Sequence, residues 1–312
     1  MTQQTETADK KAQIYSIQHF CTHDGPGIRT VVFFKGCQMN CGWCANPESQ
    51  SCQNEIGFFR DKCRMCEACQ TACSHGAIDL GSEHRINQSL CTLCDKCAEA
   101  CPRDAYKLFG EYQTCNQLLA RVLKDRPFYR KSGGGVTVSG GEPTLQTDFL
   151  VSFFEALKRE GINTALETNG CFSSEILDRL VPCTDTFLYD VKHMDSAIHE
   201  RYTGVPNELI LLNIFKLAVQ YRASVILRMP LIPGFNDDVD NLKATARFAC
   251  RLSQEGTLHG VHLLKFHNMA SNKYESLQRN YSYQQTVPYT PDRLNHIVEI
   301  FKAEYPDVVL GG

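Results

Sequence analysis

Three cysteines share the loop Gly36-Cys37-Gln38-Met39-Asn40-Cys41-Gly42-Trp43-Cys44, which follows an apolar run at residues 31–34. Their spacing, x3 and then x2, lets three thiolates hold three irons of a cubic four-iron cluster. Such a cluster normally takes four cysteines, so a loop with three leaves one iron open to a ligand that is not protein. Residues 31–35 read as a buried strand by their continuous apolar run. The loop therefore lies at the C-terminal end of a strand, which is the catalytic face of a βα-barrel.

Length and charge limit the class of protein. The chain has 312 residues, enough for one large domain or for one large and one small domain. A net charge of -3 gives no basic surface for nucleic acid. Residues 1–13 lack an apolar signal core, and no apolar run approaches the roughly 18–20 residues that span a bilayer. We therefore expect a cytoplasmic protein with no nucleic-acid or membrane partner.

The 17 cysteines need an explanation other than disulfides, because the cytoplasm keeps thiols reduced. Eleven of them fall into three tight groups, of which the loop above is the first. The others are expected to be small buried hydrophobic residues, although two of them, Cys21 and Cys52, flank the loop. These remaining six are Cys21, Cys52, Cys115, Cys171, Cys183 and Cys250.

The second and third cysteine groups lie between residues 63 and 101 and look inserted. Each is a run spaced x2, x2 and x3, the pattern of bacterial ferredoxins, in which the fourth cysteine of each run binds the cluster of the other. Structural zinc is the alternative, but zinc sites usually use two cysteine pairs separated by a longer loop. The runs form an internal repeat in which Gly76-Ala77-Ile78 matches Asp104-Ala105-Tyr106, and Ser74 stands where the pattern has proline. The expected ligands are Cys63, Cys66, Cys69 and Cys101 for one four-iron cluster and Cys91, Cys94, Cys97 and Cys73 for the other.

After residue 110, short apolar runs alternate with longer amphipathic segments, as in a parallel sheet with helical crossovers. About six βα units are present, short of the eight that close a barrel, so we expect an α/β fold of the open, partial (β/α)6 barrel type. The barrel is assigned to residues 14–51 and 111–312, the ferredoxin-like insert to 52–110, and a flexible N-terminus to 1–13. Strands are expected at 14–17, 31–35, 136–138, 163–166, 186–189, 224–227, 261–264 and 308–310, and helices at 118–123, 149–160, 209–220, 239–252 and 294–301.

Polar residues collect at the C-terminal ends of these expected strands. Each has an ordinary alternative: Asp190 could cap a helix, Lys192 and Arg228 could be solvated strand ends, and His267 could be a loop histidine with its own partners. Together, on the same edge as the cysteine loop, they indicate a ligand with amino, carboxylate and ribose groups. The set comprises Glu142, Glu167, Thr168, Asp190, Lys192, Arg228 and His267, with the Gly140-Gly141 pair beside them to let a backbone edge approach the ligand.

The three-cysteine loop, with an aromatic residue before its third cysteine, resembles the signature of radical S-adenosylmethionine (SAM) enzymes. Gly140-Gly141-Glu142 resembles the methionine-binding motif of that superfamily. Residues 23–30 (HDGPGIRT), 43–48 (WCANPE) and 139–143 (SGGEP) are similar, more narrowly, to the family that activates glycyl radical enzymes. The two-cluster insert resembles the branch that serves enzymes other than pyruvate formate-lyase, whose own activator lacks it. The resemblance covers nearly the whole chain after residue 13.

The resemblance implies roles for single residues. Cys37, Cys41 and Cys44 ligate a catalytic cluster whose open iron takes the amino and carboxylate groups of SAM. Trp43, the only tryptophan, lies near the adenine or, on the ordinary reading, packs in the core. The remaining contacts implied are Gly140, Gly141 and Glu142 to the methionine amino group, Glu167 to that group or a nearby cation, Asp190 to the ribose, and Lys192 and His267 to the methionine carboxylate.

The resemblance also implies a reaction. A reduced cluster cleaves SAM to methionine and a 5′-deoxyadenosyl radical, which takes the α-hydrogen from a glycine of a partner glycyl radical enzyme. The cofactors expected are three [4Fe–4S] clusters and SAM, and a flavodoxin- or ferredoxin-type donor would supply electrons. General resemblance favours the isethionate sulfite-lyase as partner, with choline, glycerol or diol, and hydroxyphenylacetate enzymes as alternatives. A radical enzyme acting on a small molecule or peptide, and a ferredoxin-type electron-transfer protein, are the competing classes.

Overall fold

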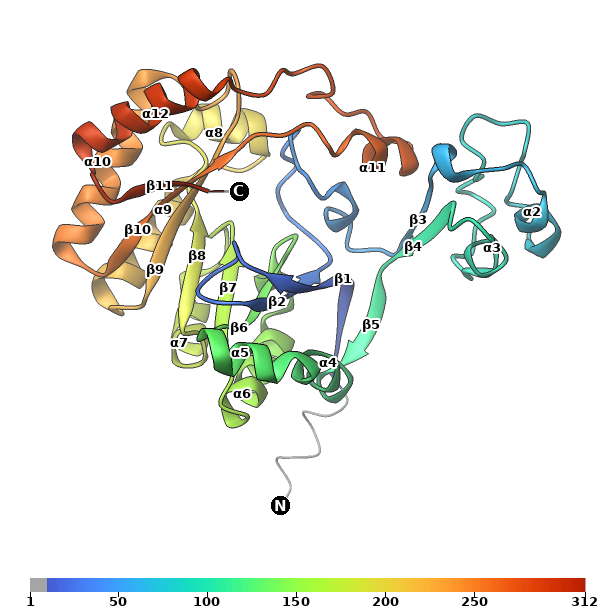
Figure 1. Ribbon diagram of the computed structural model, residues 1–312, viewed down its shortest axis with the longest axis horizontal. Helices are drawn as coiled ribbons and strands as arrows, with labels where there is room; N and C mark the ends of the chain where they lie inside the picture. Colours follow the sequence, from blue (N-terminus) through green and yellow to red (C-terminus); the bar gives the residue numbers. More distant parts are fainter. Residues whose placement is uncertain (1–9, 312) are drawn as a thin grey trace.

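The computed structural model describes residues 10–311 and is built on one large sheet (Figure 1). Its strands run in the order β11-β10-β9-β8-β7-β6-β2-β1-β5. Every pair from β2 to β11 is parallel, whereas β1 pairs antiparallel with both β2 and β5. The strands are β1 (Lys11–Cys21), β2 (Arg29–Phe34), β5 (Glu111–Thr114), β6 (Gly135–Gly140), β7 (Asn163–Thr168), β8 (Thr186–Asp190), β9 (Val225–Leu231), β10 (Leu258–Lys265) and β11 (Val308–Gly311).

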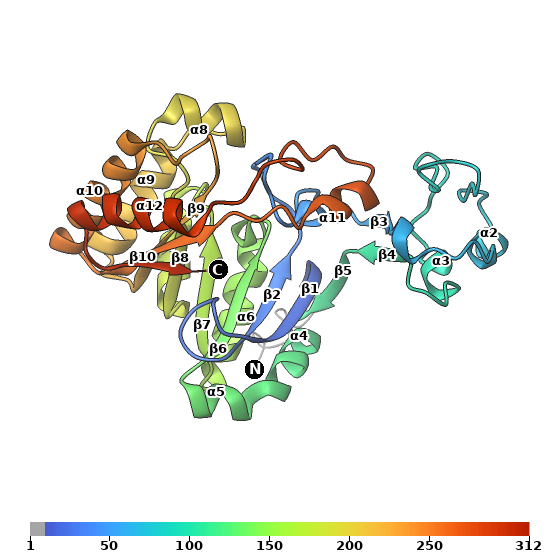
Figure 2. The same cartoon turned by 45° about the horizontal axis from the view of Figure 1, so that its top comes forward.

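Helices connect the parallel strands and bury their apolar faces against the sheet. In α6 (Thr147–Arg159), Phe149, Phe153 and Leu157 recur at helical spacing and are all buried. Figure 2 shows α10 and α12 side by side, and they also pack on each other in the contacts between elements. The other barrel helices are α4 (Cys115–Val122), α5 (Arg126–Ser132), α7 (Leu177–Leu180), α8 (Ser196–Thr203), α9 (Glu208–Phe215), α10 (Val239–Glu255), α11 (Ser271–Ser276) and α12 (Pro291–Glu304).

The predicted fold class is confirmed in its main feature. Six parallel strands, β2 and β6 to β10, are each followed by helical chain before the next strand, and β11 ends the sheet. The strand expected at 14–17 is longer than predicted, because β1 begins at Lys11 and pairs with Thr114 of β5. The predicted flexible N-terminus at 1–13 is therefore wrong for residues 11–13, and residues 1–9 lie outside the described part of the chain.

The chain from β3 (Glu55–Phe58) to β4 (Tyr106–Phe109), which follows the cysteine loop, forms a second unit that stands to one side of the large sheet (Figure 1). It leaves and returns through this antiparallel pair and carries the short helices α2 (Ala68–Ala72) and α3 (Lys96–Glu99). It has a hydrophobic core of its own. Members of that core include Ile56, Phe58, Ile78, Ile86 and Tyr106.

A strap after β10, defined here as residues 271–279, ties this unit to the cysteine loop. Lys273 Nζ lies 2.8 Å from a carboxylate oxygen of Glu48, just after the loop, and Arg279 pairs with Glu55 at 2.5 Å. Gln278 Nε2 donates to the backbone oxygen of His84 at 2.9 Å. In both ribbon views α11 lies between the barrel and the insert (Figures 1 and 2). Among residues 10–311, no helix is long and apolar enough to cross a membrane.

Candidate active site

The cysteine loop is fixed to the barrel by backbone hydrogen bonds at both ends. Gly36, with φ of +102°, turns the chain out of β2, and its N–H donates to the oxygen of Ser49 at 2.7 Å. Farther along, Asn40 N–H donates at 2.8 Å to the oxygen of Thr203, the last residue of α8. The loop is thus held between the end of β2 and the helix that follows β8.

The loop forms one wall of a cavity of about 420 Å³ at the C-terminal ends of the strands. The cavity brings together residues from β2, β6, β7, β8 and β9 that are distant in sequence. Of the predicted site residues, it is lined by Cys37, Cys41, Trp43, Cys44, Gly140, Gly141, Glu167, Asp190, Lys192 and His267.

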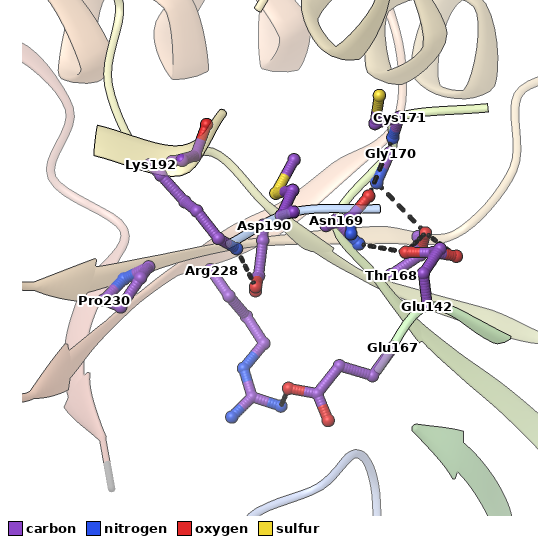
Figure 3. Close-up of polar contacts among 12 residues, drawn as sticks. Glu142, Glu167, Thr168, Asn169, Gly170, Cys171, Asp190, Lys192, Arg228 and Pro230 are labelled. Atoms are coloured by element: carbon purple, nitrogen blue, oxygen red, sulfur yellow. Dashed lines mark hydrogen bonds and ion pairs between the residues drawn. The ribbon is translucent and has the colours of Figure 1, made fainter. Parts of the chain in front are cut away.

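Asp190 and Lys192 form an ion pair on this cavity's wall, with 2.5 Å between carboxylate and ammonium (Figure 3). Burial disfavours the Lys192 ammonium, but the negative charge of Asp190 outweighs this effect and raises the pKa of Lys192. The second carboxylate oxygen of Asp190, Oδ1, is buried and has no hydrogen-bond partner. A buried acceptor without a partner beside a cavity fits a ligand that brings a hydroxyl donor.

Glu167 and Arg228 form a second charged pair on the cavity wall. Glu167 Oε1 lies 3.0 Å from Arg228 Nη1 (Figure 3). Glu167 Oε2 accepts from the Ser139 hydroxyl at 2.6 Å. Asp24, from the turn between β1 and β2, approaches the same guanidinium at 3.9 Å. Both oxygens of Glu167 therefore already have partners within the protein. The Nε of Arg228 is buried and has none.

Glu142 has partners within the protein that the sequence did not predict. Its carboxylate is fully buried outside the cavity lining and accepts from Thr144 Oγ1 at 2.7 Å, Thr168 Oγ1 at 2.8 Å and Asn169 N–H at 2.8 Å. Burial raises the pKa of Glu142, and these hydrogen bonds oppose that rise. Glu142 thus joins the ends of β6 and β7 through its carboxylate, and the contact predicted with the methionine amino group stays a prediction. It is a positioning residue for Asn169.

Gly140 and Gly141 both line the cavity, and close packing within the protein also requires glycine at these two positions. A Cβ on Gly140, where φ is +123°, would clash with the backbone oxygen of Phe34. A Cβ on Gly141 would clash with the backbone oxygen of Gly36. Any side chain here would push β6 away from the start of the cysteine loop.

Trp43 lines the cavity and also packs on Phe235, with ring centroids 4.4 Å apart. Its position thus agrees with core packing and leaves the contact to adenine as a prediction. His267 lies at the exposed rim of the cavity.

Sequence reasoning gave no role to Asp24 or Asn169, and none to Arg228 beyond its place at a strand end. The available signal was position, since Asp24 lies in the Gly-Pro-Gly turn and the other two at strand ends.

The sulfurs of the loop suit a metal cluster. Burial raises the pKa of Cys37 and of Cys41 to about 12, so each thiol keeps its proton at neutral pH unless a cation displaces it. A coordinating cation deprotonates a thiol outright. Asn169 Nδ2 lies 3.6 Å from Cys37 Sγ, where it can orient the thiolate. The donor set fits three irons of a cluster.

The insert gathers its eight cysteines into two separate cavities. The first is lined by Cys63, Cys66, Cys69 and Cys101, and the second by Cys73, Cys91, Cys94 and Cys97. These are the two crossed sets that the ferredoxin spacing predicts, in which each run lends its fourth cysteine to the other. All 17 cysteines lie within the described residues, and each is a free thiol.

Family models match both parts of the chain. The Radical SAM superfamily model covers residues 94–249, and the 4Fe-4S dicluster domain model covers residues 62–105. The dicluster match favours iron over the zinc alternative for the insert. The chain is therefore a radical SAM protein with an added dicluster unit.

Named relatives show to which family of radical SAM proteins the chain belongs. The chain is 40% identical to the choline trimethylamine-lyase activating enzyme of Oleidesulfovibrio alaskensis, over 88% of this chain and 89% of that one. It is 38% identical to the trans-4-hydroxy-L-proline dehydratase activating enzyme of Clostridioides difficile, over 96% and 99%. The chain belongs to the glycyl-radical-enzyme activating family. The family resemblance proposed from the motifs is confirmed.

Activating enzymes that are named for other partner enzymes are equally similar to this chain. The isethionate sulfite-lyase activating enzyme of Desulfovibrio desulfuricans is also 40% identical, over 86% of this chain and 88% of that one. Among solved structures, Streptococcus suis SuiB bound to precursor peptide SuiA aligns with a TM-score of 0.51 over 90% of this chain and 48% of that one. At 12% identity this likeness concerns the fold alone. The chain is a radical SAM activating enzyme that uses iron–sulfur clusters and SAM.

The positioning role of Glu142 predicts a loss of stability in Glu142→Gln. The new amide can keep one acceptor oxygen, but its NH2 group then faces donors such as Asn169 N–H. We expect the free energy of unfolding to fall by about 1–3 kcal/mol, the usual cost of an unsatisfied buried group. Anaerobic urea unfolding, followed by the fluorescence of Trp43, measures this. Glu155→Gln on the exposed face of α6 is the control, and equal losses in both variants would contradict the assignment.

Proposed function

We propose that this chain activates a partner glycyl radical enzyme. When bound, a reduced cluster and SAM supply the 5′-deoxyadenosyl radical that takes the α-hydrogen from one glycine of the partner. The observation that carries the proposal is the single cavity in which the three-cysteine loop and the Asp190–Lys192 pair both take part. The cluster needs the wall that the cysteine loop forms. The zwitterionic methionine part of SAM needs the charged wall that Asp190 and Lys192 form in the same cavity.

The chain's own residues bind and orient these groups. Cys37, Cys41 and Cys44 hold three irons, which leaves the fourth for SAM. The Lys192 ammonium faces the methionine carboxylate, with His267 at the rim as a second contact. Asp190 Oδ1, the buried acceptor without a partner, accepts from a ribose hydroxyl.

The remaining cavity lining shapes the site and keeps water out. The backbone of Gly140 and Gly141 faces the methionine amino group, and Glu167, anchored by Arg228 and Ser139, supplies negative charge nearby. Trp43 flanks the adenine. Apolar side chains in the lining limit access of water to a reactive species. Apolar members of the lining are Phe33, Met39, Ile232, Leu264 and Phe266.

We also propose two domains and three clusters. Within the described residues, the partial barrel comprises residues 11–51 and 111–311, and the insert comprises residues 52–110. The insert holds two [4Fe–4S] clusters in its crossed cysteine sets, in addition to the cluster of the barrel. This proposal is supported by the two four-cysteine cavities and by the dicluster match.

The partner is the part of the proposal that sequence identity does not resolve. Isethionate sulfite-lyase is the first candidate, and choline trimethylamine-lyase, with an equally similar activator, is the second. The enzyme, loaded with iron and SAM under anaerobic conditions, is mixed with each lyase, and the glycyl radical doublet is recorded by electron paramagnetic resonance (EPR). We expect one partner to reach a much higher radical yield than the others. If a panel that also holds glycerol, diol and hydroxyphenylacetate enzymes gave no radical, the proposed function would be wrong.

The electron donor is proposed to be a reduced flavodoxin or ferredoxin. The same radical assay, run with a reduced flavodoxin or ferredoxin in place of dithionite, tests this. We expect radical formation with at least one of them. Radical with dithionite and none with either protein donor would reject this class of donor without affecting the activation itself.

A further inference from the structure

The two cysteine runs of the insert are related by an approximate twofold symmetry that extends to their hydrogen bonds. Ala77 N–H lies 3.3 Å from Cys73 Sγ, and Ala105 N–H lies 3.3 Å from Cys101 Sγ. The left-handed residues match as well, with φ of 63° at both Glu67 and Asp95. Each cluster cavity therefore has nearly the same backbone frame.

One position breaks this symmetry in a way that changes the chemistry. Tyr106, which follows the second run, lines the cavity of Cys63, Cys66, Cys69 and Cys101. Its counterpart after the first run, Ile78, lines the other cavity and carries no polar atom in its side chain. At this pair of matching positions the frame thus presents a phenol to one cluster site and an alkyl side chain to the other. The second cavity has polar side chains at other positions, namely His75, Thr92, Asp95 and Lys96.

Within residues 10–311, the Tyr106 hydroxyl has no hydrogen-bond partner. The residue is 4% exposed, and its oxygen is buried without a hydrogen bond. Burial is the main cause that raises the pKa of this phenol, and the nearby Cys69 sulfur raises that pKa further. A buried hydroxyl normally finds an acceptor. The acceptor available here is sulfur in the cluster cavity.

We propose that the Tyr106 hydroxyl donates a hydrogen bond to the cluster held by Cys63, Cys66, Cys69 and Cys101, at Cys69 Sγ or an adjacent sulfide, and raises the reduction potential of that cluster. The inference rests on the proposed assignment of two clusters to the insert. Hydrogen bonds to cluster sulfur are among the factors that set the reduction potential. The donor stabilises the more negative, reduced state more than the oxidised state, because hydrogen bonds to charge are stronger. Ile78 offers the other cluster no such bond.

The test is a redox titration of the full, cluster-loaded enzyme followed by EPR. Tyr106→Phe removes one oxygen and keeps the ring that packs on Phe58. We expect one insert cluster to become about tenfold harder to reduce, a fall of ~59 mV for a one-electron couple, while the other cluster does not change. Tyr112→Phe, at a 59% exposed site in β5, is the matched control and should change neither potential.

A second measurement is independent of potentials. In D2O, electron–nuclear double resonance should detect couplings from the backbone deuterons of Ala77 and Ala105 and one further coupling from the Tyr106 hydroxyl. Tyr106→Phe should lose only this further coupling. Unchanged potentials and unchanged deuteron couplings, in a variant that still holds both insert clusters, would overturn the inference. An insert that binds fewer than two clusters in the wild type would instead overturn the cluster assignment, and the inference with it.

Discussion

Cys41→Ala is expected to abolish SAM cleavage even under strong chemical reduction. The loop supplies only three ligands, so the variant would leave two irons of the cluster without protein ligands. Cys41 is also the most enclosed of the three, 8% exposed beneath the other loop residues. We expect the iron content to fall by about four per chain and 5′-deoxyadenosine to drop below detection. Iron analysis and chromatography of the reaction products measure the two effects.

Cys250→Ala is the control for the loss of a thiol. Cys250 lies on α10, away from all three cysteine groups, and its sulfur accepts only from Gln254. This variant should keep the full iron content and full cleavage. If Cys41→Ala still produced 5′-deoxyadenosine, the loop would not be the cluster site and the proposed function would fail.

Lys192→Met is expected to weaken SAM binding by about 10–100-fold. The variant removes the proposed contact to the methionine carboxylate and leaves the Asp190 charge without its partner at 2.5 Å. A hydrogen bond to a charged group contributes about 1.5–3 kcal/mol, which corresponds to that range of dissociation constants. Anaerobic calorimetry of SAM on the cluster-loaded protein gives the dissociation constant directly.

The chain offers a closely matched control for this change. Lys158 and Asp185 form a pair of nearly the same length, 2.6 Å, but their side chains are 37% and 31% exposed on the outside of the barrel. Exposed pairs contribute about 0–1 kcal/mol. Lys158→Met should therefore leave SAM binding unchanged. Equal affinities in both variants, at equal iron content, would remove Lys192 from the site.

Much of the site was predictable because its signals are local. Thiolate spacing within a loop fixes how many irons the loop can hold, and the x2-x2-x3 runs carry their own crossed pairing. The order of strands follows from alternation along the chain, and polar residues at their ends meet at one edge of a parallel sheet. Asp190 and Lys192 are in this class, since Asp190 ends β8 and Lys192 follows it closely.

What sequence reasoning missed depends on contacts between distant segments. Glu142 ends a strand as Asp190 does, but the Thr168 hydroxyl and Asn169 N–H from the neighbouring strand turn its carboxylate away from the cavity. β5 has a weak pattern of its own and forms because β1 offers it an edge. The strap at 271–279 reads as polar loop in the sequence, and its partners Glu48 and Glu55 lie over 200 residues earlier.

The antiparallel pair β3 and β4 has a consequence for the history of this fold. The two strands leave and rejoin the barrel as neighbours, roughly 4.8 Å apart. A single tight turn could therefore replace the whole insert without shifting the register of any barrel strand. Gain or loss of the insert therefore needs only one in-frame insertion or deletion between the codons for β2 and β5. A lineage can thus acquire or discard the insert while the fold of the barrel stays unchanged.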